Sequence, residues 1–479
     1  MIRRVIFFAA ALLIVPAARS GETAGNAATL RAGSFTLESA ISLALKQNPE
    51  ILKSRYEIER TRGQVIEVRA QALPLLANTA QYTQLDPDSI QSGGNRSSFD
   101  GTSNSFILQD KSWKITFEAR QTLYSGGKVR AALKIAAFEE DASIQLLRET
   151  VARVIANVRT QFYTALLNRE LITVAGESIQ LLGDELKDQQ NRFSAGTVPR
   201  FNVLRAEVEL ANARPELIRS RNNFLISRLE LAKTLGLDEQ ATINVVGQLL
   251  MPPRELNLSQ ALVTARKSRA ILKARVNSVG VEQQQITVAR AGYKPTLDAR
   301  LGYGFENAQN DIGLGEVVDG WYFGFVGSWN IFDGFQTKGR VKQAQARLAS
   351  AEVDLSDSER QVELEVQRAY AKVNEAREVI ASQSKVVEQA DEALRLSRER
   401  LAAGAGTQLD VLDARVALTR ARTTQKTALA DYNVALAEYD RAIGAETIHD
   451  YSLPALKRAP VTPPVPAPRT RRADLIGAD

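Results

Sequence analysis

Two pairs of segments, at about 75–124 and 296–332, alternate between apolar and polar residues with a period of two. This alternation is typical of β-strands with one apolar face. Each segment has about 9–12 residues, the length that a tilted transmembrane strand needs. We therefore expect the aromatics on the apolar faces to meet lipid, although a soluble sheet with one buried face would show the same alternation. These aromatics are Trp113, Phe117, Tyr303, Trp321, Phe323, Phe325 and Trp329.

A long stretch without proline and with almost no glycine follows each strand pair, at 127–193 and at 339–403. A helix of some 65 residues is roughly 100 Å long. Apolar residues at spacings of four and three predict a coiled-coil seam in each stretch, for example at Val362, Val366 and Ala369. A helix of this length cannot be buried in one globular domain, so it must reach across a gap; the helices alone would also fit a soluble coiled coil.

The chain is internally duplicated, which is the first property to establish for a fold. Residues 192–208 lie over 400–416 without gaps, with identical residues at seven of the seventeen positions. Each repeat has the same order: a helical segment of about 35 residues that ends at a proline, a strand pair, a long helix, a glycine turn and a closing helix. The repeats span 35–236 and 256–444, with closing helices at 200–236 and 408–444.

The two repeats differ in one predicted loop. The offset between equivalent positions falls from 221 before the strands to 208 after them. The first repeat therefore carries about 13 more residues between Pro74 and its glycine turn. This places an insertion in the loop that joins the first strand pair.

The two ends of the chain have compositions of their own. Arg3 and Arg4 precede an 11-residue apolar run and small residues, which predicts a secretory signal peptide over residues 1–20, with cleavage after Ala18 or Ser20. The apolar run is shorter than a transmembrane helix, so an uncleaved anchor is the weaker alternative. Residues 454–479 are rich in proline and arginine and are predicted to form a disordered tail.

The inventory of reactive residues argues against an enzyme, a metal centre or a cofactor. There is no cysteine, and His449 is the single histidine, so thiolate sites, disulfides and multi-histidine sites cannot form. The net charge is +6 over 479 residues, with acidic and basic residues interspersed along the helices. Nucleic-acid binding needs a concentrated basic patch on a suitable fold, and the sequence predicts neither.

The ordered motifs resemble the TolC-type outer membrane efflux protein family. Leu37 to Ala44, followed by Asn48-Pro49, is similar to the opening helix of that family. The stretches Leu123-Tyr-Ser-Gly-Gly127 and Trp329 to Phe335 are similar to its strand-to-helix motif. The glycine turns that precede the duplicated Val-Leu-x-Ala segments are similar to its helix-turn-helix tips. The likeness covers about residues 35–445, and the ordered set occurs twice.

The resemblance implies the fold and the partners. It implies an internally duplicated α+β membrane protein, in which a homotrimer forms a 12-stranded barrel from four transmembrane strands per chain and a long coiled-coil α-barrel. It places the protein in the outer membrane, in contact with lipid, with a long periplasmic extension. It implies a passive conduit for a tripartite efflux pump or a type I secretion system, served by a periplasmic adaptor and an inner-membrane transporter. A secreted structural coiled-coil protein is the alternative.

The resemblance also assigns two sets of residues. The tips meet the adaptor in such proteins, which implies contacts at Gly196, Val203, Leu204, Ala206, Gly404, Asp410, Val411, Leu412 and Ala414. Polar side chains before the tips close the periplasmic end, and here the acidic gate candidates are Asp184, Glu185, Glu388, Asp391 and Glu392. An ordinary solvated helix face would also contain such residues. From the residues themselves, Asn202 and Asp410 are predicted to cap the returning helices.

Overall fold

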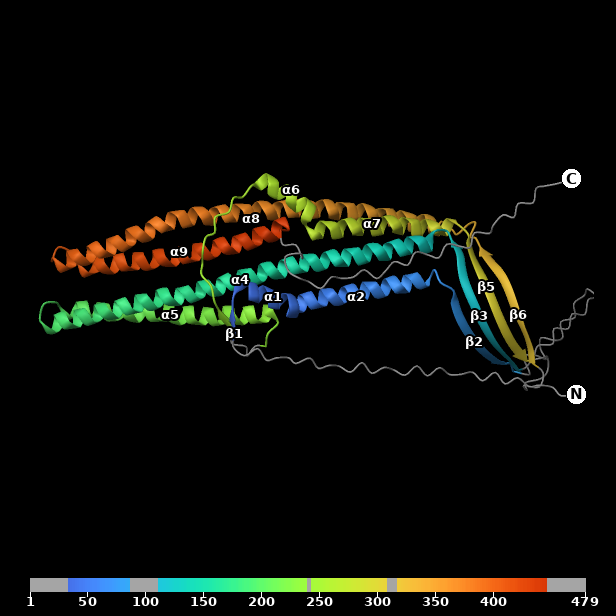
Figure 1. The fold of residues 1–479 in the computed structure, drawn as a ribbon, viewed down its shortest axis with the longest axis horizontal. Helices are drawn as coiled ribbons and strands as arrows, with labels where there is room; N and C mark the ends of the chain where they lie inside the picture. Colours follow the sequence, from blue (N-terminus) through green and yellow to red (C-terminus); the bar gives the residue numbers. More distant parts are fainter. Residues whose placement is uncertain (1–32, 87–110, 239–242, 308–316, 446–479) are drawn as a thin grey trace, which may run out of the picture.

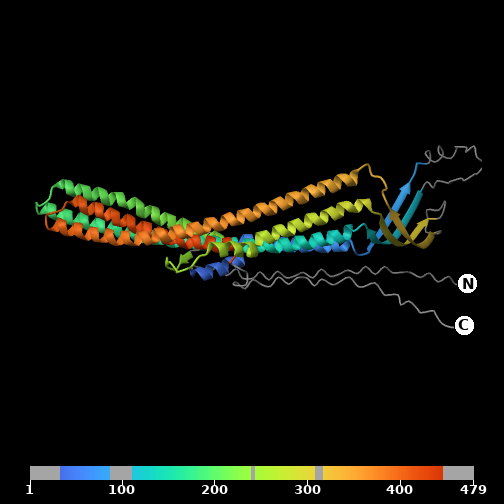
Figure 2. The same ribbon diagram turned by 90° about the horizontal axis from the view of Figure 1, so that it is seen from above.

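The computed structural model describes residues 33–86, 111–238, 243–307 and 317–445. These residues form a long rod of paired helices that ends in one β-sheet (Figures 1 and 2). Three sequence predictions lie outside the described residues: the signal peptide at 1–20, the enlarged loop, most of which falls within 87–110, and the tail at 454–479. His449 also lies outside them.

Two helical hairpins build most of the rod. Each consists of a helix of 67 residues and a closing helix of 36 residues. The first hairpin is α4 (Lys128–Ser194) and α5 (Arg200–Leu235), and the second is α8 (Gln336–Ala402) and α9 (Gln408–Ile443). α4 packs against α9, so the order across this half of the rod is α8, α9, α4, α5 (Figure 1). α5 and α8 therefore lie at opposite edges.

Shorter helices complete the half of the rod next to the sheet. α2 packs on α4, α4 packs on α7, and α7 packs on α8. Each of the helical segments predicted before Pro74 and Pro295 is two helices rather than one. The four helices are α1 (Leu37–Gln47), α2 (Pro49–Ala70), α6 (Leu258–Ser268) and α7 (Ala270–Arg290).

The break between α1 and α2 has a local cause. Pro49 is the first residue of α2 and has no N–H to continue α1, while the Asn48 side chain accepts hydrogen bonds from the N–H groups of Glu50 and Ile51. Asn48 also donates to the Thr234 carbonyl, which ties the break to the end of α5. In the second repeat Arg269 takes this place and donates to the Arg441 carbonyl near the end of α9.

One four-stranded antiparallel sheet contains both predicted strand pairs, in the order β2-β3-β5-β6. Its strands are β2 (Leu75–Gln84), β3 (Lys111–Ser125), β5 (Thr296–Asn307) and β6 (Val317–Ser328). The register shifts between Thr122 and Tyr124, which leaves Leu123 as the extra residue of a bulge. The bulge interrupts the alternation of side chains along β3 at Leu123.

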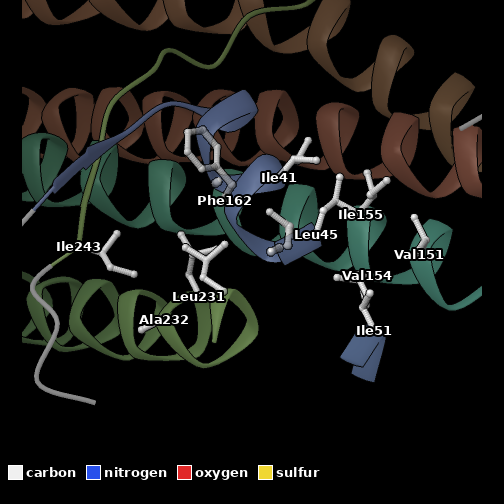
Figure 3. Packing of buried hydrophobic residues seen from close by; sticks show 14 of the residues in the cluster. Ile41, Leu45, Ile51, Val151, Val154, Ile155, Phe162, Leu231, Ala232 and Ile243 are labelled. Carbon is white, nitrogen blue, oxygen red and sulfur yellow. The ribbon is translucent and has the colours of Figure 1, made fainter. Parts of the chain in front are cut away.

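A small parallel sheet lies near the middle of the rod, beside the first repeat. It pairs β1 (Gly33–Phe35) with β4 (Ile243–Val245), and the alternation pattern did not predict it. Ile243 packs in the largest apolar cluster, with residues from α1, α2, α4 and α5 (Figure 3). This cluster fixes the start of the first repeat against the first hairpin.

Candidate functional site

The sheet has one apolar, largely aromatic face. Phe117, Tyr303 and Trp321 lie opposite one another on β3, β5 and β6, so their side chains form a row on one face. Phe323 and Phe325 continue the row along β6 with ring centroids 5.1 Å apart. Except for Trp113, which is partly buried, the predicted aromatics are exposed, and Trp321 has 73% of its surface accessible. Such a large exposed apolar patch marks an interaction surface.

The opposite face of the sheet is polar and cross-linked. Arg120 donates to Asp298 at 2.5 Å, and Thr122 donates to the same carboxylate at 2.8 Å. Lys114 and Glu306 form an ion pair at 3.1 Å between β3 and β5. The Tyr322 hydroxyl donates to Glu118 at 2.6 Å across the same face. The sheet thus has one apolar face and one polar face.

A glycine on the polar face makes room for one of these contacts. A Cβ atom at Gly302 would lie 2.4 Å from the ring of Tyr322. Because real Cβ atoms do not come so close to a ring, only glycine lets the Tyr322 ring lie across β5 and reach Glu118. The contact between Tyr322 and Glu118 was not predicted from the sequence. A glycine inside an otherwise regular strand is the sequence feature that could have indicated it.

Trp329 differs from the other predicted strand aromatics. It follows the last residue of β6, and its indole N–H donates to the Tyr293 carbonyl at 3.1 Å. The strand ends here because the chain turns into α8, with Asp333 accepting from the Thr337 N–H and Phe335 in the left-handed region. Trp329 therefore lies where the sheet meets the helices, and its assignment to the strand was wrong.

The two hairpins turn in the same way at the other end of the rod. Gly196 and Gly404 have φ angles of 75° and 72°, and the residue after each donates to a carbonyl five residues earlier. This is the Schellman arrangement, which needs a residue at positive φ. The glycine spacing predicted both turns.

The starts of the two returning helices differ. Thr407 is the N-cap of α9, and its hydroxyl accepts from the Asp410 N–H, while the Asp410 carboxylate accepts from the Thr407 N–H at 2.8 Å. This capping box holds the pKa of Asp410 below its ordinary value. Pro199 is the N-cap of α5 and makes no side-chain cap. The prediction that Asn202 caps α5 is therefore wrong, because Pro199 takes the capping position.

Some of the predicted tip residues are buried and others are exposed to solvent. Val203, Ala206, Val411 and Leu412 lie inside the hairpins, and Ala414 is partly buried. Gly196, Leu204, Gly404 and Asp410 face solvent. Five exposed apolar residues of the duplicated stretches were not among the predicted contacts; these are Phe193, Phe201, Val208, Leu409 and Val416.

The gate candidates differ in their exposure and in their ion-pair partners. Glu185 is largely buried and pairs with Arg415, while Asp391 pairs with Arg422 at 3.4 Å. Glu392 pairs with Arg395 on its own helix, which lowers the pKa of the Glu392 carboxyl. Asp184 and Glu388 are exposed. The structure thus brings Glu185 and Asp391 to arginines of α9 that the sequence analysis did not select.

Ion pairs follow the contact between α4 and α9 within the chain. Beyond Arg415, Arg422 pairs with Glu177 at 3.1 Å, and Lys426 pairs with Glu170 at 2.9 Å. Arg415 and Arg422 are seven residues apart, one heptad, so they lie on one side of α9. That spacing, together with acidic residues at similar intervals on α4, is the sequence feature from which these ion pairs could have been predicted. We call this contact between α4 and α9 the ionic seam.

Metal-binding clusters and membrane-spanning helices are both absent from the described part of the chain. Within residues 33–86, 111–238, 243–307 and 317–445, no acidic, histidine or cysteine cluster is arranged to hold a metal ion. None of the helices in these same ranges is both long and apolar enough to cross a bilayer.

Comparison with known proteins assigns the family. Residues 40–237 and 261–445 match the family described as outer membrane efflux protein. TolC of Escherichia coli is 25% identical over 454 residues, which cover 90% of this chain and 87% of that protein. CyaE of Bordetella pertussis is 26% identical over 72% of this chain and 71% of that protein.

Solved structures agree on the fold. The outer membrane channel CmeC of Campylobacter jejuni superposes with a TM-score of 0.73 at 17% identity, over 85% of each chain. The family match covers both repeats, and the structure supplies the long helices and the sheet of such channels. The chain thus belongs to the outer membrane efflux protein family, as a passive outer-membrane channel protein for efflux or type I secretion with a long periplasmic tunnel, and it is not an enzyme.

Proposed function

We propose that three copies of this chain close into one continuous conduit, in which twelve strands form a barrel in the outer membrane and twelve long helices form the periplasmic tunnel. One observation carries this proposal. The sheet has four strands, and β2 and β6 lie at its two edges without a further partner among the described strands. An open edge needs a partner, and in lipid every backbone polar group must be bonded.

The faces of the sheet give the barrel its orientation. The aromatic face, with Phe117, Tyr303, Trp321, Phe323 and Phe325, meets lipid, because burying a polar face in hydrocarbon would be far less favourable. The face with Arg120, Asp298 and Glu118 lines water. Trp329 and Tyr293 lie at the junction with the helices, where amphipathic aromatics meet the membrane boundary.

The tips are the proposed contact with a periplasmic adaptor that links the channel to an inner-membrane transporter. Support comes from the exposed part of the predicted set, Gly196, Leu204, Gly404 and Asp410, and from the exposed Phe201 beside them. A Cβ atom at Gly196 or Gly404 would have no atom of the described residues within 4 Å, apart from those of its own chain neighbours. The buried members, such as Val203 and Val411, hold the turn in shape.

The gate belongs to the same proposal. Glu185 and Asp391 restrain α9 through Arg415 and Arg422 near the tips. A tunnel that widens at this end must change these contacts. Asp184, Glu388 and Glu392 would then add negative charge to the mouth without joining α4 to α9.

The experiment is mass measurement of the protein extracted from outer membranes in detergent. Native mass spectrometry is expected to give the mass of three mature chains, and copurification is expected to bring an adaptor and an inner-membrane transporter. A monomer in the soluble periplasmic or secreted fraction would contradict the proposal, and would point to the secreted coiled-coil alternative.

A further inference from the structure

A hollow of about 470 Å³ lies where the helices meet the sheet. Its wall comes from the first turns of α4 and α8, from the end of α7 and from the helix-side ends of β3, β5 and β6 (Figure 1). The charged residues that line it are all basic, namely Lys128, Lys294, Arg340 and Arg347. We call this hollow the basic pocket; its volume is that of a small-molecule site.

The basic pocket opens on the polar face of the sheet. Thr296 and Ser328 line it and lie opposite each other on β5 and β6. Ser328 is six residues after Tyr322, whose hydroxyl reaches Glu118 on the polar face. Because successive side chains of a strand alternate between faces, Thr296 and Ser328 belong to that face too. The pocket therefore faces away from the aromatic side of the sheet.

The four basic side chains are exposed and have no counter-charge among the described residues, where no carboxylate oxygen lies within 4 Å of their nitrogens. Asp298, on the same face, is already held by two hydrogen bonds. Arg347 also borders the next hollow along α7 and α8, whose acidic residues are Glu139, Glu282 and Asp354. A hollow lined by charges of one sign concentrates their potential, so the basic pocket attracts anions.

Two further features favour an anion with several oxygen atoms. α4 begins at Lys128, and its N-cap, Gly127, has no side chain to cover the first N–H groups. This end of a helix carries a positive partial charge. In addition, the Ser125 hydroxyl accepts from the Val129 N–H at 3.3 Å, which leaves its own hydrogen to donate into the pocket.

The first repeat does not share the basic residues. Lys294 precedes the proline at the start of its strand pair, and the other positions follow at the offset of 208. The first-repeat equivalents of Lys294, Arg340 and Arg347 are Leu73, Ala132 and Glu139. Since both repeats form the same elements, the fold does not need a cation at these three positions. A role in binding explains them better than a role in packing.

We propose that the basic pocket binds a soluble anion that carries phosphate-type oxygens. The planar guanidinium of arginine matches two phosphate oxygens at once, and lysine adds a compact positive charge. The place of the pocket in the wall of a conduit rests on the proposed function, whereas the binding itself does not. The inference adds a solute class to that function, because anionic solutes would pass a site that retains them.

Calorimetry tests the binding. Inorganic phosphate is titrated into the detergent-extracted protein at low salt and slightly alkaline pH, where phosphate is mainly a dianion. Saturable binding of one phosphate per chain is expected, and it should weaken as sodium chloride is added. The double variant Lys294→Leu/Arg340→Ala installs the residues of the first repeat and should lower the affinity by about tenfold or more. Equal affinity in the wild type and this variant would overturn the site.

A matched control removes the same charge outside the pocket. Lys338 and Lys342 are exposed in the first turns of α8 and do not line the hollow. Lys338→Ala/Lys342→Ala should bind phosphate as the wild type does. If this control loses as much affinity as Lys294→Leu/Arg340→Ala, the attraction comes from overall charge and the pocket is not a site.

Titration in nanodiscs separates a solute from a lipid headgroup. One set contains only phosphatidylcholine, and the other also contains phosphatidylglycerol. Similar phosphate affinity is expected in both, because the pocket opens on the polar face of the sheet. Loss of phosphate binding in the phosphatidylglycerol nanodiscs alone would mean that a lipid phosphate fills the pocket, and would overturn the assignment to a soluble anion.

Planar-bilayer recording distinguishes failure of this inference from failure of the proposed function. In a potassium chloride gradient, Lys294→Leu/Arg340→Ala should shift the reversal potential toward cation selectivity, whereas Lys338→Ala/Lys342→Ala should shift it less. A conducting trimer that binds no phosphate overturns the anion site and leaves the proposed function standing. Phosphate binding by a protein that forms neither trimers nor channels overturns the proposed function and the place of the site in a conduit.

Discussion

Arg415 on α9 donates to Glu185 on α4 at 3.5 Å, and both side chains are almost excluded from solvent. Burial lowers the pKa of Arg415, and Glu185 is the main opposing influence. Glu185→Gln leaves a buried cation without its counter-charge, which is unfavourable. We expect the two hairpins to separate more readily near the tips, so that single-channel conductance rises severalfold in planar bilayers.

Glu388 supplies the control for this variant. It is an exposed gate candidate on α8, and within the described residues it has no ion-pair partner. Glu388→Gln should leave conductance within the error of wild type. Equal conductance of wild type, Glu185→Gln and Asp391→Asn would rule out the gate assignment.

Arg269 gives a prediction about stability. It is 4% exposed and contacts Glu149 on α4 at 3.2 Å and Glu365 on α8 at 3.1 Å, so it ties the two long helices together. Arg269→Ala should lower the free energy of unfolding by about 2 kcal/mol. It removes the hydrogen bond to the Arg441 carbonyl and one of the two arginines that pair with Glu149 and Glu365, the other being Arg441. Denaturant titration of the detergent-solubilised protein measures this change.

A nearby surface pair provides the comparison. Arg266 pairs with Glu363 in solvent, and exposed pairs contribute about 0.5 kcal/mol. Arg266→Ala should therefore change stability little. If both variants lose equal stability, the Arg269 contacts do not join the repeats as described.

Neighbouring residues of β6 test the orientation of the sheet. Phe323 lies on the aromatic face and Tyr322 on the polar face. Phe323→Arg places a charge in lipid at about 2–4 kcal/mol near the midplane, so the yield from outer membranes should fall strongly. Tyr322→Arg can still pair with Glu118 and should insert normally. The reverse result would mean that the polar face meets lipid.

The capping box of the second tip predicts local order. Thr407→Ala removes one half of it and should destabilise the start of α9 by about 1 kcal/mol. Hydrogen exchange of the peptide around Gln408 should then speed up, while the tip at Pro199, which has no such cap, stays unchanged. Wild-type exchange in this peptide serves as the reference, and an unchanged rate in Thr407→Ala would show that the box does not hold the helix.

The same box has a defined pH dependence. The pKa of Asp410 is held below its ordinary value by hydrogen bonds from Thr407. Stabilisation from a lowered carboxyl pKa is present above the unfolded value and is lost as pH falls through the folded one. Protection around Gln408 should therefore be constant from neutral pH to about pH 5 and fall below about pH 4. Loss of protection between pH 7 and pH 6 would contradict this assignment.

The sequence predicted the elements well where several local features agree. The long helices begin and end within a few residues of their predicted limits, because heptads, glycine turns and the absence of proline all agree there. The break at Arg269 had no such signal, because arginine is ordinary in a helix interior. Arg269 ends α6 where it bonds to Arg441, Glu149 and Glu365, and the adjacent Ser268 hydroxyl donates to the Ile443 carbonyl. That cause is tertiary and cannot be deduced from local pattern.

The candidate site was likewise predicted where local pattern sufficed and missed where tertiary contacts decide. The aromatic face was predicted from the alternation, but the bulge at Leu123 and the end of β6 before Trp329 were not, since both interrupt the period. The acidic gate candidates could be chosen from the sequence, because they lie just before the predicted tips. Their partners Arg415 and Arg422 depend on how α9 crosses α4, which the sequence of either helix does not specify.

The central claim is that copies of this chain form a water-filled channel through the outer membrane. Single-channel recording of the purified trimer fraction in planar bilayers tests it most directly. We predict discrete, long-lived current steps that appear with this fraction and disappear when trimers are dissociated before insertion. A trimer fraction that floats with lipid vesicles but gives no current steps, in wild type and in Glu185→Gln alike, would contradict the account.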